Sequence, residues 1–404
     1  MNKTILVFDD DSARGARWAA SLRPVVPKAY TVQSLKIQEF KDAIEELEQR
    51  RRAARKGEHS RVKWTNVLDS ASILIIDYDL LELDKQNYVT GETVAYLARC
   101  YSQCGMIIGL NQFGENTFDL TLKAHPDSYA DFNLGSEQLA NPGLWGRPWT
   151  GFRPWAWPVL PKAAEAYENR VKELRNHLKT NIVSFLNFPP EVVATLPRAT
   201  AEYVTLEDTM ANTTFAGFVL ESDNGFRRND KPLNNSMILR VAAARLAKWL
   251  ERCVLAGQDI LVDAPHLVAR YPSLITNNRA KIQSWNKIAS LTAPEPLGID
   301  HKKIEAFRFS RDNWISRPAW FWPMVANFEQ LLEVVEPWSI QHPDWVFCED
   351  LSVFLPKSMV REFVADLPSP FIRRYVADPN SNLPERLATS LKNIDYRPAL
   401  RFSL

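Results

Sequence analysis

Short apolar runs alternate with helical patterns in the first third of the chain, and this alternation constrains the fold more than any other feature. The β-prone runs are Thr4–Phe8, Tyr30–Gln33, Ile73–Ile76 and Met106–Leu110. Amphipathic helical spacing occurs in three separate segments: after the first run, beyond residue 36, and at 91–99. Strands that alternate with helices indicate right-handed crossovers and a parallel sheet covered on both faces. We therefore expect a doubly wound, flavodoxin-like α/β domain over residues 1–145.

Acidic residues follow two of these expected strands. Asp9 and Asp10 come directly after the first strand, and Asp77 ends the third. These strands are neighbours in the flavodoxin-like order, so the carboxylates should meet at the carboxyl edge of the sheet. A hard cation such as Mg²⁺ would relieve their repulsion. A carboxylate beside that cation can act as a nucleophile toward a phosphoryl donor.

Three segments resemble the receiver domain of bacterial response regulators in two-component signal transduction. They are ILVFDDDSARGARWAASL, ILIIDYDLLE and TGETVAYLAR, and they cover about a third of the chain. The resemblance implies that Asp9 and Asp10 hold Mg²⁺ together with Asp77, which accepts the phosphoryl group. The family's switch Ser/Thr falls on Asn111 and its Lys on Asn133, so neither group is kept. With a charged helical insertion near 36–61, these departures indicate an atypical receiver or a pseudo-receiver.

Two other interpretations of the acidic residues remain open. Asp before a helix is common because it caps the helix and complements its dipole, so these residues need no further role. Asp77 and Asp79 also resemble the nucleophile and acid of haloacid-dehalogenase-like phosphatases. The Thr expected there is Leu81, and no matching acidic motif follows downstream.

The basic run Arg50–Lys56 also has two interpretations. Its cations are able to contact nucleic-acid phosphates. The formal net charge of the whole chain is only +1, however, so no global field attracts a polyanion. We favour a solvated helix end, where the helix dipole favours cations.

Two Trp/Pro clusters share an Arg-Pro, Trp-x-Trp-Pro arrangement. One contains Arg153, Trp155 and Trp157, and the other contains Arg317, Trp320 and Trp322. Trp and Arg dominate binding hot spots, so the clusters are candidates for a protein-interaction or ligand-stacking surface. Alternatively, they are a linker over 146–160 and a buried core segment, which the usual burial of Trp favours.

Residues 161–404 indicate an α-rich output domain with minor β content and two subdomains as one option. We expect helices at 163–178 and 237–256, and short strands at 214–220 and 260–262. His266 and His301 each have an acidic neighbour, which more often reflects a satisfied polar contact than a ligand site. No motif here specifies a reaction, and no helix-turn-helix is evident.

The sequence therefore predicts a signalling or regulatory protein that binds partner proteins, with the phosphorylation of Asp77 left open. Four cysteines do not form a disulfide framework, and no signal peptide or membrane span is evident, so we expect a cytoplasmic location without membrane association. An enzyme of phosphoryl transfer or of unrecognised C-terminal activity is the alternative. A nucleic-acid-binding component acting through Arg50–Lys56 is the weaker third possibility.

Overall fold

The computed structural model divides into two compact units. Unit 1 contains residues 1–148, 158–186 and 198–249, and unit 2 contains 149–157, 187–197 and 250–404. Residues 161–186 and 198–249, which we expected in the second domain, thus belong to the same compact unit as the N-terminal strands. The described residues are 3–58, 64–80, 89–111, 128–136, 139–146, 159–205, 212–271, 274–275, 279–289, 302–327, 344–348, 351–363, 374–378 and 380–391.

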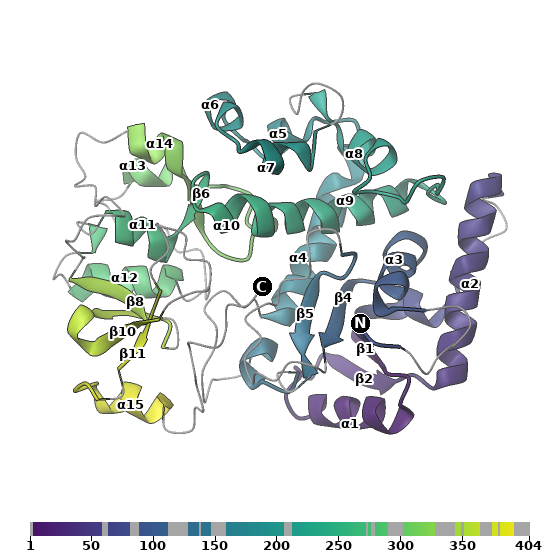
Figure 1. Ribbon diagram of the computed structural model, residues 1–404, viewed down its shortest axis with the longest axis horizontal. Coiled ribbons are helices and arrows are strands. Elements are labelled where there is room, and N and C mark those ends of the chain that lie inside the picture. Colours follow the sequence, from purple (N-terminus) through teal and green to yellow (C-terminus); the bar gives the residue numbers. More distant parts are fainter. Residues whose placement is uncertain are drawn as a thin grey trace. The chain divides into compact units, whose positions relative to one another are not determined.

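Unit 1 is built on a five-stranded, wholly parallel sheet in the order β2-β1-β3-β4-β5 (Figure 1). The strands are β1 (Lys3–Phe8), β2 (Tyr30–Ser34), β3 (Ala71–Asp77), β4 (Met106–Asn111) and β5 (Phe132–Gly135). Ile5 to Phe8 and Ile73 to Ile76 are fully buried, as strands covered on both faces require. The predicted α/β class and parallel sheet are confirmed, and the strand order is compatible with a flavodoxin-like domain.

Helices α1 (Ser12–Leu22), α2 (Ile37–Lys56) and α3 (Gly91–Tyr101) alternate with these strands. Asp11 caps α1 and Thr90 caps α3, each accepting a backbone N–H of the first turn. The charged segment near 36–61 is thus largely the long helix α2, which ends at Gly57 in the left-handed conformation (φ 76°).

Unit 1 also contains helices that follow β5 in the chain. They are α4 (Leu160–Glu173), α5 (Ile182–Phe185), α7 (Arg198–Glu202), α8 (Phe215–Glu221) and α9 (Asn235–Trp249), with 3-10 turns at Val67–Ser70, Pro142–Trp145 and Leu174–Asn176. Helix α9 packs against α3, α4 and α8. Its buried Arg245 and Lys248 donate to the carbonyl of Ser128, which fixes the chain just before β5.

The strand expected at 214–220 is wrong, because these residues form α8. The Thr214 hydroxyl accepts the N–H of Gly217 at 3.1 Å and caps the helix. Phe215, Phe218 and Val219 then share one buried helix face at i, i+3 and i+4. The apolar run therefore fills a helical stripe instead of both faces of a strand.

Unit 2 combines short helices with two small sheets. Its helices are α6 (Pro190–Ala194), α10 (Leu255–Gly257), α11 (Ala264–Arg270), α12 (Arg279–Ala289), α13 (Lys302–Glu305), α14 (Trp322–Asn327) and α15 (Glu385–Leu391), with a π-helical turn at Leu250–Val254 and a 3-10 turn at Lys357–Met359. Strands β6 (Leu261–Asp263) and β7 (Ala319–Phe321) pair antiparallel, and β6 confirms the expected strand at 260–262. A mixed sheet of order β10-β11-β8-β9 was not foreseen; its strands are β8 (Trp345–Cys348), β9 (Val353–Pro356), β10 (Val360–Phe363) and β11 (Arg374–Ala377).

None of the helices in the described part of the chain combines the length and the apolar character needed to span a membrane.

Candidate functional site

Three buried carboxylates meet at the carboxyl edge of the parallel sheet. Asp9 and Asp10 follow β1, and Asp77 is the last residue of β3. The register pairs Phe8 with Ile76, so the next residue of each segment, Asp9 and Asp77, lies at the same edge of the sheet. Each carboxylate places an oxygen within 4.8 Å of the other two. Asp9 and Asp77 are 1% exposed and Asp10 is 7% exposed, so the carboxylates converge as the strand order predicts, and the cluster is buried.

Arg14 pairs with two members of this acidic cluster. Its Nε lies 2.6 Å from Asp9 Oδ2, and its Nη2 lies 3.6 Å from Asp10 Oδ1. The other Asp9 oxygen accepts the N–H of Asp11 at 2.8 Å. Asp11 in turn caps α1 and so fixes the helix turn that carries Arg14. Among the described residues, one guanidinium pairs with two of the three carboxylates, so these four groups together carry a net negative charge when all are ionised.

Burial, with a smaller contribution from the charges of Asp9 and Asp10, raises the pKa of Asp77 to about 7 against the opposing effects of the Asp79 N–H and Arg14. Burial also raises the pKa of Asp9, although Arg14 and the Asp11 N–H oppose this. Near neutral pH, a proton on Asp77 or a cation beside it would therefore stabilise the cluster of carboxylates. The donor set consists of hard carboxylate oxygens on rigid strand ends, which fits Mg²⁺.

A second polar cluster, which the sequence analysis missed, lies next to Asp77 along the chain. The Tyr78 hydroxyl donates to Glu92 Oε2 at 2.7 Å, and Ser128 Oγ donates to the same oxygen at 2.6 Å. Glu92 Oε1 accepts the N–H of Tyr129 at 2.7 Å. Burial raises the pKa of Tyr78 to about 12, so this phenol stays a donor. The sequence feature that could have indicated this cluster is Tyr78, which lies between Asp77 and Asp79.

Two glycines permit this close packing. A Cβ on Gly109 in β4 would lie 2.5 Å from the Tyr78 ring. A Cβ on Gly91 would lie 2.6 Å from the carbonyl oxygen of Asp77 and 2.7 Å from Tyr78 Cα. Helix α3 therefore begins against the backbone that ends β3, which holds Asp77 in place.

The two positions that depart from the receiver pattern lie on β4 and β5. Asn111 ends β4 opposite Gly135, and only its backbone is described. Asn133 lies in β5 opposite Gly109, and its Oδ1 is buried with no hydrogen-bond partner among the described residues. Leu81, relevant to the phosphatase alternative, lies outside the described residues.

The basic end of α2 is not simply a solvated helix end, so that expectation is wrong for its first arginine. Arg50 is 3% exposed, pairs with Glu46 and Asp69 at 2.7 and 2.8 Å, and donates to the Tyr101 carbonyl at 3.0 Å. The sequence could not place Asp69, which lies in the turn before β3.

The second Trp cluster lies in unit 2, and the structure contradicts the interaction surface at Trp320. Trp320 in β7 is fully buried in the core of unit 2, as the core-segment alternative required. Arg317 is 10% exposed at its side chain and pairs with Asp263 and Glu251 at 3.1 and 3.3 Å. Trp322 is half-buried, with the Arg270 guanidinium 4.0 Å from its ring centroid. Arg153, Trp155 and Trp157 lie outside the described residues.

His266 has the satisfied contact expected from its sequence, because its Nδ1 pairs with Asp263. Burial alone would raise the pKa of Asp263, but His266 and Arg317 outweigh it and lower the pKa to about 2. Asp263 also caps α11, which gives the carboxylate a structural role. His301 lies outside the described residues.

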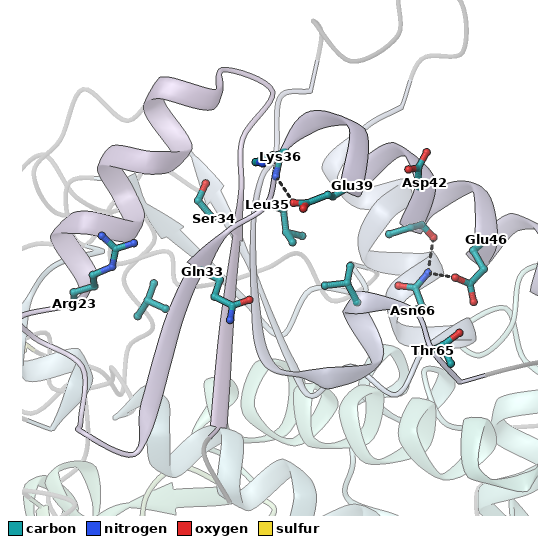
Figure 2. A pocket seen from close by; sticks show the side chains of 13 residues that line it. Arg23, Gln33, Ser34, Leu35, Lys36, Glu39, Asp42, Glu46, Thr65 and Asn66 are labelled. Atoms are coloured by element: carbon teal, nitrogen blue, oxygen red, sulfur yellow. Dashed lines mark hydrogen bonds between the residues drawn. The ribbon is translucent and has the colours of Figure 1, made fainter.

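An open groove of about 660 Å³ runs beside the edge strand β2 (Figure 2). Glu39, Asp42 and Glu46 of α2 line this groove together with Lys36 at the start of the helix and Gln33 of β2. Glu39 accepts the N–H of Lys36 at 3.0 Å, and Glu46 accepts from Asn66 at 3.1 Å. None of the three clustered aspartates lines this groove.

Comparison with protein-family models, with curated proteins and with solved structures gives no match to this chain.

Proposed function

We propose that unit 1 is a receiver-like regulatory module whose acidic cluster binds Mg²⁺ and whose conformation controls the docking of partner proteins. The observation that carries the proposal is the burial of Asp9, Asp10 and Asp77 within 4.8 Å of one another at the carboxyl edge of a parallel sheet. Asp residues that only cap helices do not require such convergence. The four free thiols of the chain support the reducing cytoplasm as its compartment.

Asp77 is the proposed phospho-acceptor within this cluster. Its carboxylate oxygen would attack the phosphorus of a small phosphodonor, form an acyl phosphate and release the rest of the donor as the leaving group. Mg²⁺ bound to the three carboxylates would neutralise charge on the phosphoryl oxygens. Arg14, which touches Asp9 and Asp10, would give way or share their oxygens when the cation binds.

The two Asn positions set the kind of regulation that we propose. Asn111 and Asn133 carry neither the hydroxyl that follows the phosphoryl group nor the ammonium that neutralises it. We therefore propose a pseudo-receiver in which cation binding, more than phosphorylation, fixes the docking surface. The module in this proposal binds partners and is not an enzyme.

The test combines a fluorescence and a mass measurement on the full chain. Tryptophan fluorescence is titrated with Mg²⁺, with and without beryllofluoride, and the protein mass is measured after incubation with a small phosphodonor. We expect a Mg²⁺-dependent change that Asp77→Asn abolishes and the neighbouring Asp79→Asn retains. The absence of a Mg²⁺-dependent fluorescence change in the wild type would refute the proposal. Loss of the change only in Asp79→Asn would also refute it.

The same variants decide the phosphatase alternative. Hydrolysis of phosphorylated small molecules that requires both Asp77 and Asp79 would make unit 1 an enzyme. The receiver-like proposal expects no turnover from either variant or from the wild type.

A further inference from the structure

Two basic segments that are distant in the sequence form one surface in unit 1. The end of α2 approaches the turn at 227–231, just before α9 (Figure 1). Asp230 joins them, because Arg51 Nε lies 2.9 Å and Arg55 Nε lies 2.6 Å from its two oxygens. The Tyr96 hydroxyl of α3 donates to the same carboxylate. We call the basic residues of these two joined segments the basic surface; they are Arg51, Arg52, Arg55, Lys56, Arg227, Arg228 and Lys231.

The negative charge of Asp230 is shared between Arg51 and Arg55. Burial alone would raise the pKa of Asp230, but hydrogen bonds from Arg51, Tyr96 and Arg55 outweigh it and lower the pKa. The carboxylate therefore stays ionised and offsets part of the charge of two arginines. The other exposed cations of the basic surface have no acidic partner within 4.0 Å among the described residues; they are Arg52, Lys56, Arg227, Arg228 and Lys231.

The cations sit on a rigid support. Arg50 is buried and anchors α2 to Asp69 and to the Tyr101 carbonyl. The Arg227 guanidinium lies 4.2 Å from the centroid of the Tyr96 ring, which holds it in place. Arg52 and Lys56 are four residues apart on α2 and so share one exposed face. A ligand would therefore meet three arginines that are held by contacts, Arg51, Arg55 and Arg227, beside cations that project from a fixed helix.

The chemistry of the basic surface suits phosphate oxygens. Arginine presents a planar fork of donors that matches phosphate geometry. The large hydrophobic side chains exposed in the described part of the chain are Ile37 and Leu220, and neither belongs to this surface. The surface thus lacks the apolar anchor of a protein hot spot and the apolar residues that insert into a membrane. A ligand held only by charge and hydrogen bonds must itself carry closely spaced anions.

We infer that the basic surface binds the phosphodiester backbone of a nucleic acid without reading its sequence. Double-stranded DNA carries about one negative charge per 1.7 Å of helix axis, which supplies such spacing. Because the surface uses none of the three clustered aspartates, nucleic-acid binding and cation binding can succeed or fail independently.

The experiment measures fluorescence anisotropy of a labelled duplex of random sequence with the full chain over a range of salt concentrations. We compare the wild type with the double variant Arg52→Gln/Arg228→Gln, and with Lys41→Gln, an exposed cation on the acidic first half of α2. We expect the double variant to bind at least about 10-fold more weakly at low salt, and its slope of log K on log salt to be shallower by about 2. Lys41→Gln should bind like the wild type.

Circular dichroism and the urea concentration at the unfolding midpoint establish that each variant is folded. Absence of duplex binding by the wild type at low salt would overturn the inference. Equal affinity of the wild type and the double variant would also overturn it. Binding of polyglutamate as tight as that of the duplex would identify an acidic polypeptide as the ligand and would likewise refute it.

Discussion

Replacing Asp77 by Asn should remove a pH-dependent loss of stability that the acidic cluster imposes on unit 1. Burial raises the pKa of Asp77 to about 7 in the folded chain, whereas an unfolded Asp has a pKa of about 3.9. The folded state therefore holds this proton more tightly than the unfolded state. Its contribution to stability is fully present below about pH 4, falls as the pH rises, and is lost above about pH 7.

The size of the effect follows from the width of that window. Each pKa unit corresponds to about 1.4 kcal/mol, so the full difference is at most about 4 kcal/mol. Between pH 5.5 and pH 8.5 the free energy of unfolding should fall by about 2 kcal/mol in the wild type from this group alone. Asn has nearly the same shape and no charge, so Asp77→Asn should lack this decline.

The assay is urea unfolding followed by tryptophan fluorescence in EDTA at pH 5.5, 7 and 8.5. Asp79→Asn is the control, since it removes a neighbouring carboxylate outside the cluster and should keep the wild-type decline. If the wild type and Asp77→Asn show the same pH dependence of the free energy of unfolding, burial and repulsion do not raise the pKa of Asp77 as we infer.

Further predictions concern the residues around the cluster and the core of unit 2. Arg14→Met should tighten Mg²⁺ binding by about 10-fold or more in isothermal titration calorimetry, since it removes a competing cation, and weaker binding would contradict this. Gly91→Ala should destabilise the chain by about 1–3 kcal/mol in urea, because its Cβ would meet the backbone of Asp77 and Tyr78, and wild-type stability would show that α3 can shift. Trp320→Ala should lower the free energy of unfolding of unit 2 by about 3–5 kcal/mol, and a small loss would mean that Trp320 is not packed as described.

The parallel sheet and the acidic cluster were predictable because both depend on local patterns. Buried parallel strands appear as continuous apolar runs, and the runs ending at Phe8 and Ile76 carry the aspartates directly after them. Strand order then brings Asp9 and Asp77 together. The run at 214–220 failed because a short apolar stretch serves one face of a helix as well as it serves a strand.

Local sequence patterns do not show which distant residues come into contact. Nothing near Arg51 indicates that its partner is Asp230, and nothing near Tyr78 indicates that it donates to Glu92. Charge alone predicts that an arginine prefers a carboxylate, but only the packing of α2, α3 and α9 decides which one. The strands β8 to β11 are each only four residues long, so their pairing leaves no clear period in the sequence.

Calorimetric titration of the full chain with Mg²⁺ at pH 8 tests the central claim most directly, with Asp77→Asn and Asp79→Asn measured in parallel. We predict saturable binding of one Mg²⁺ by the wild type and by Asp79→Asn, and at least about 10-fold weaker binding by Asp77→Asn. Absence of binding by the wild type, or equal binding by Asp77→Asn, would contradict a cation site formed by Asp9, Asp10 and Asp77.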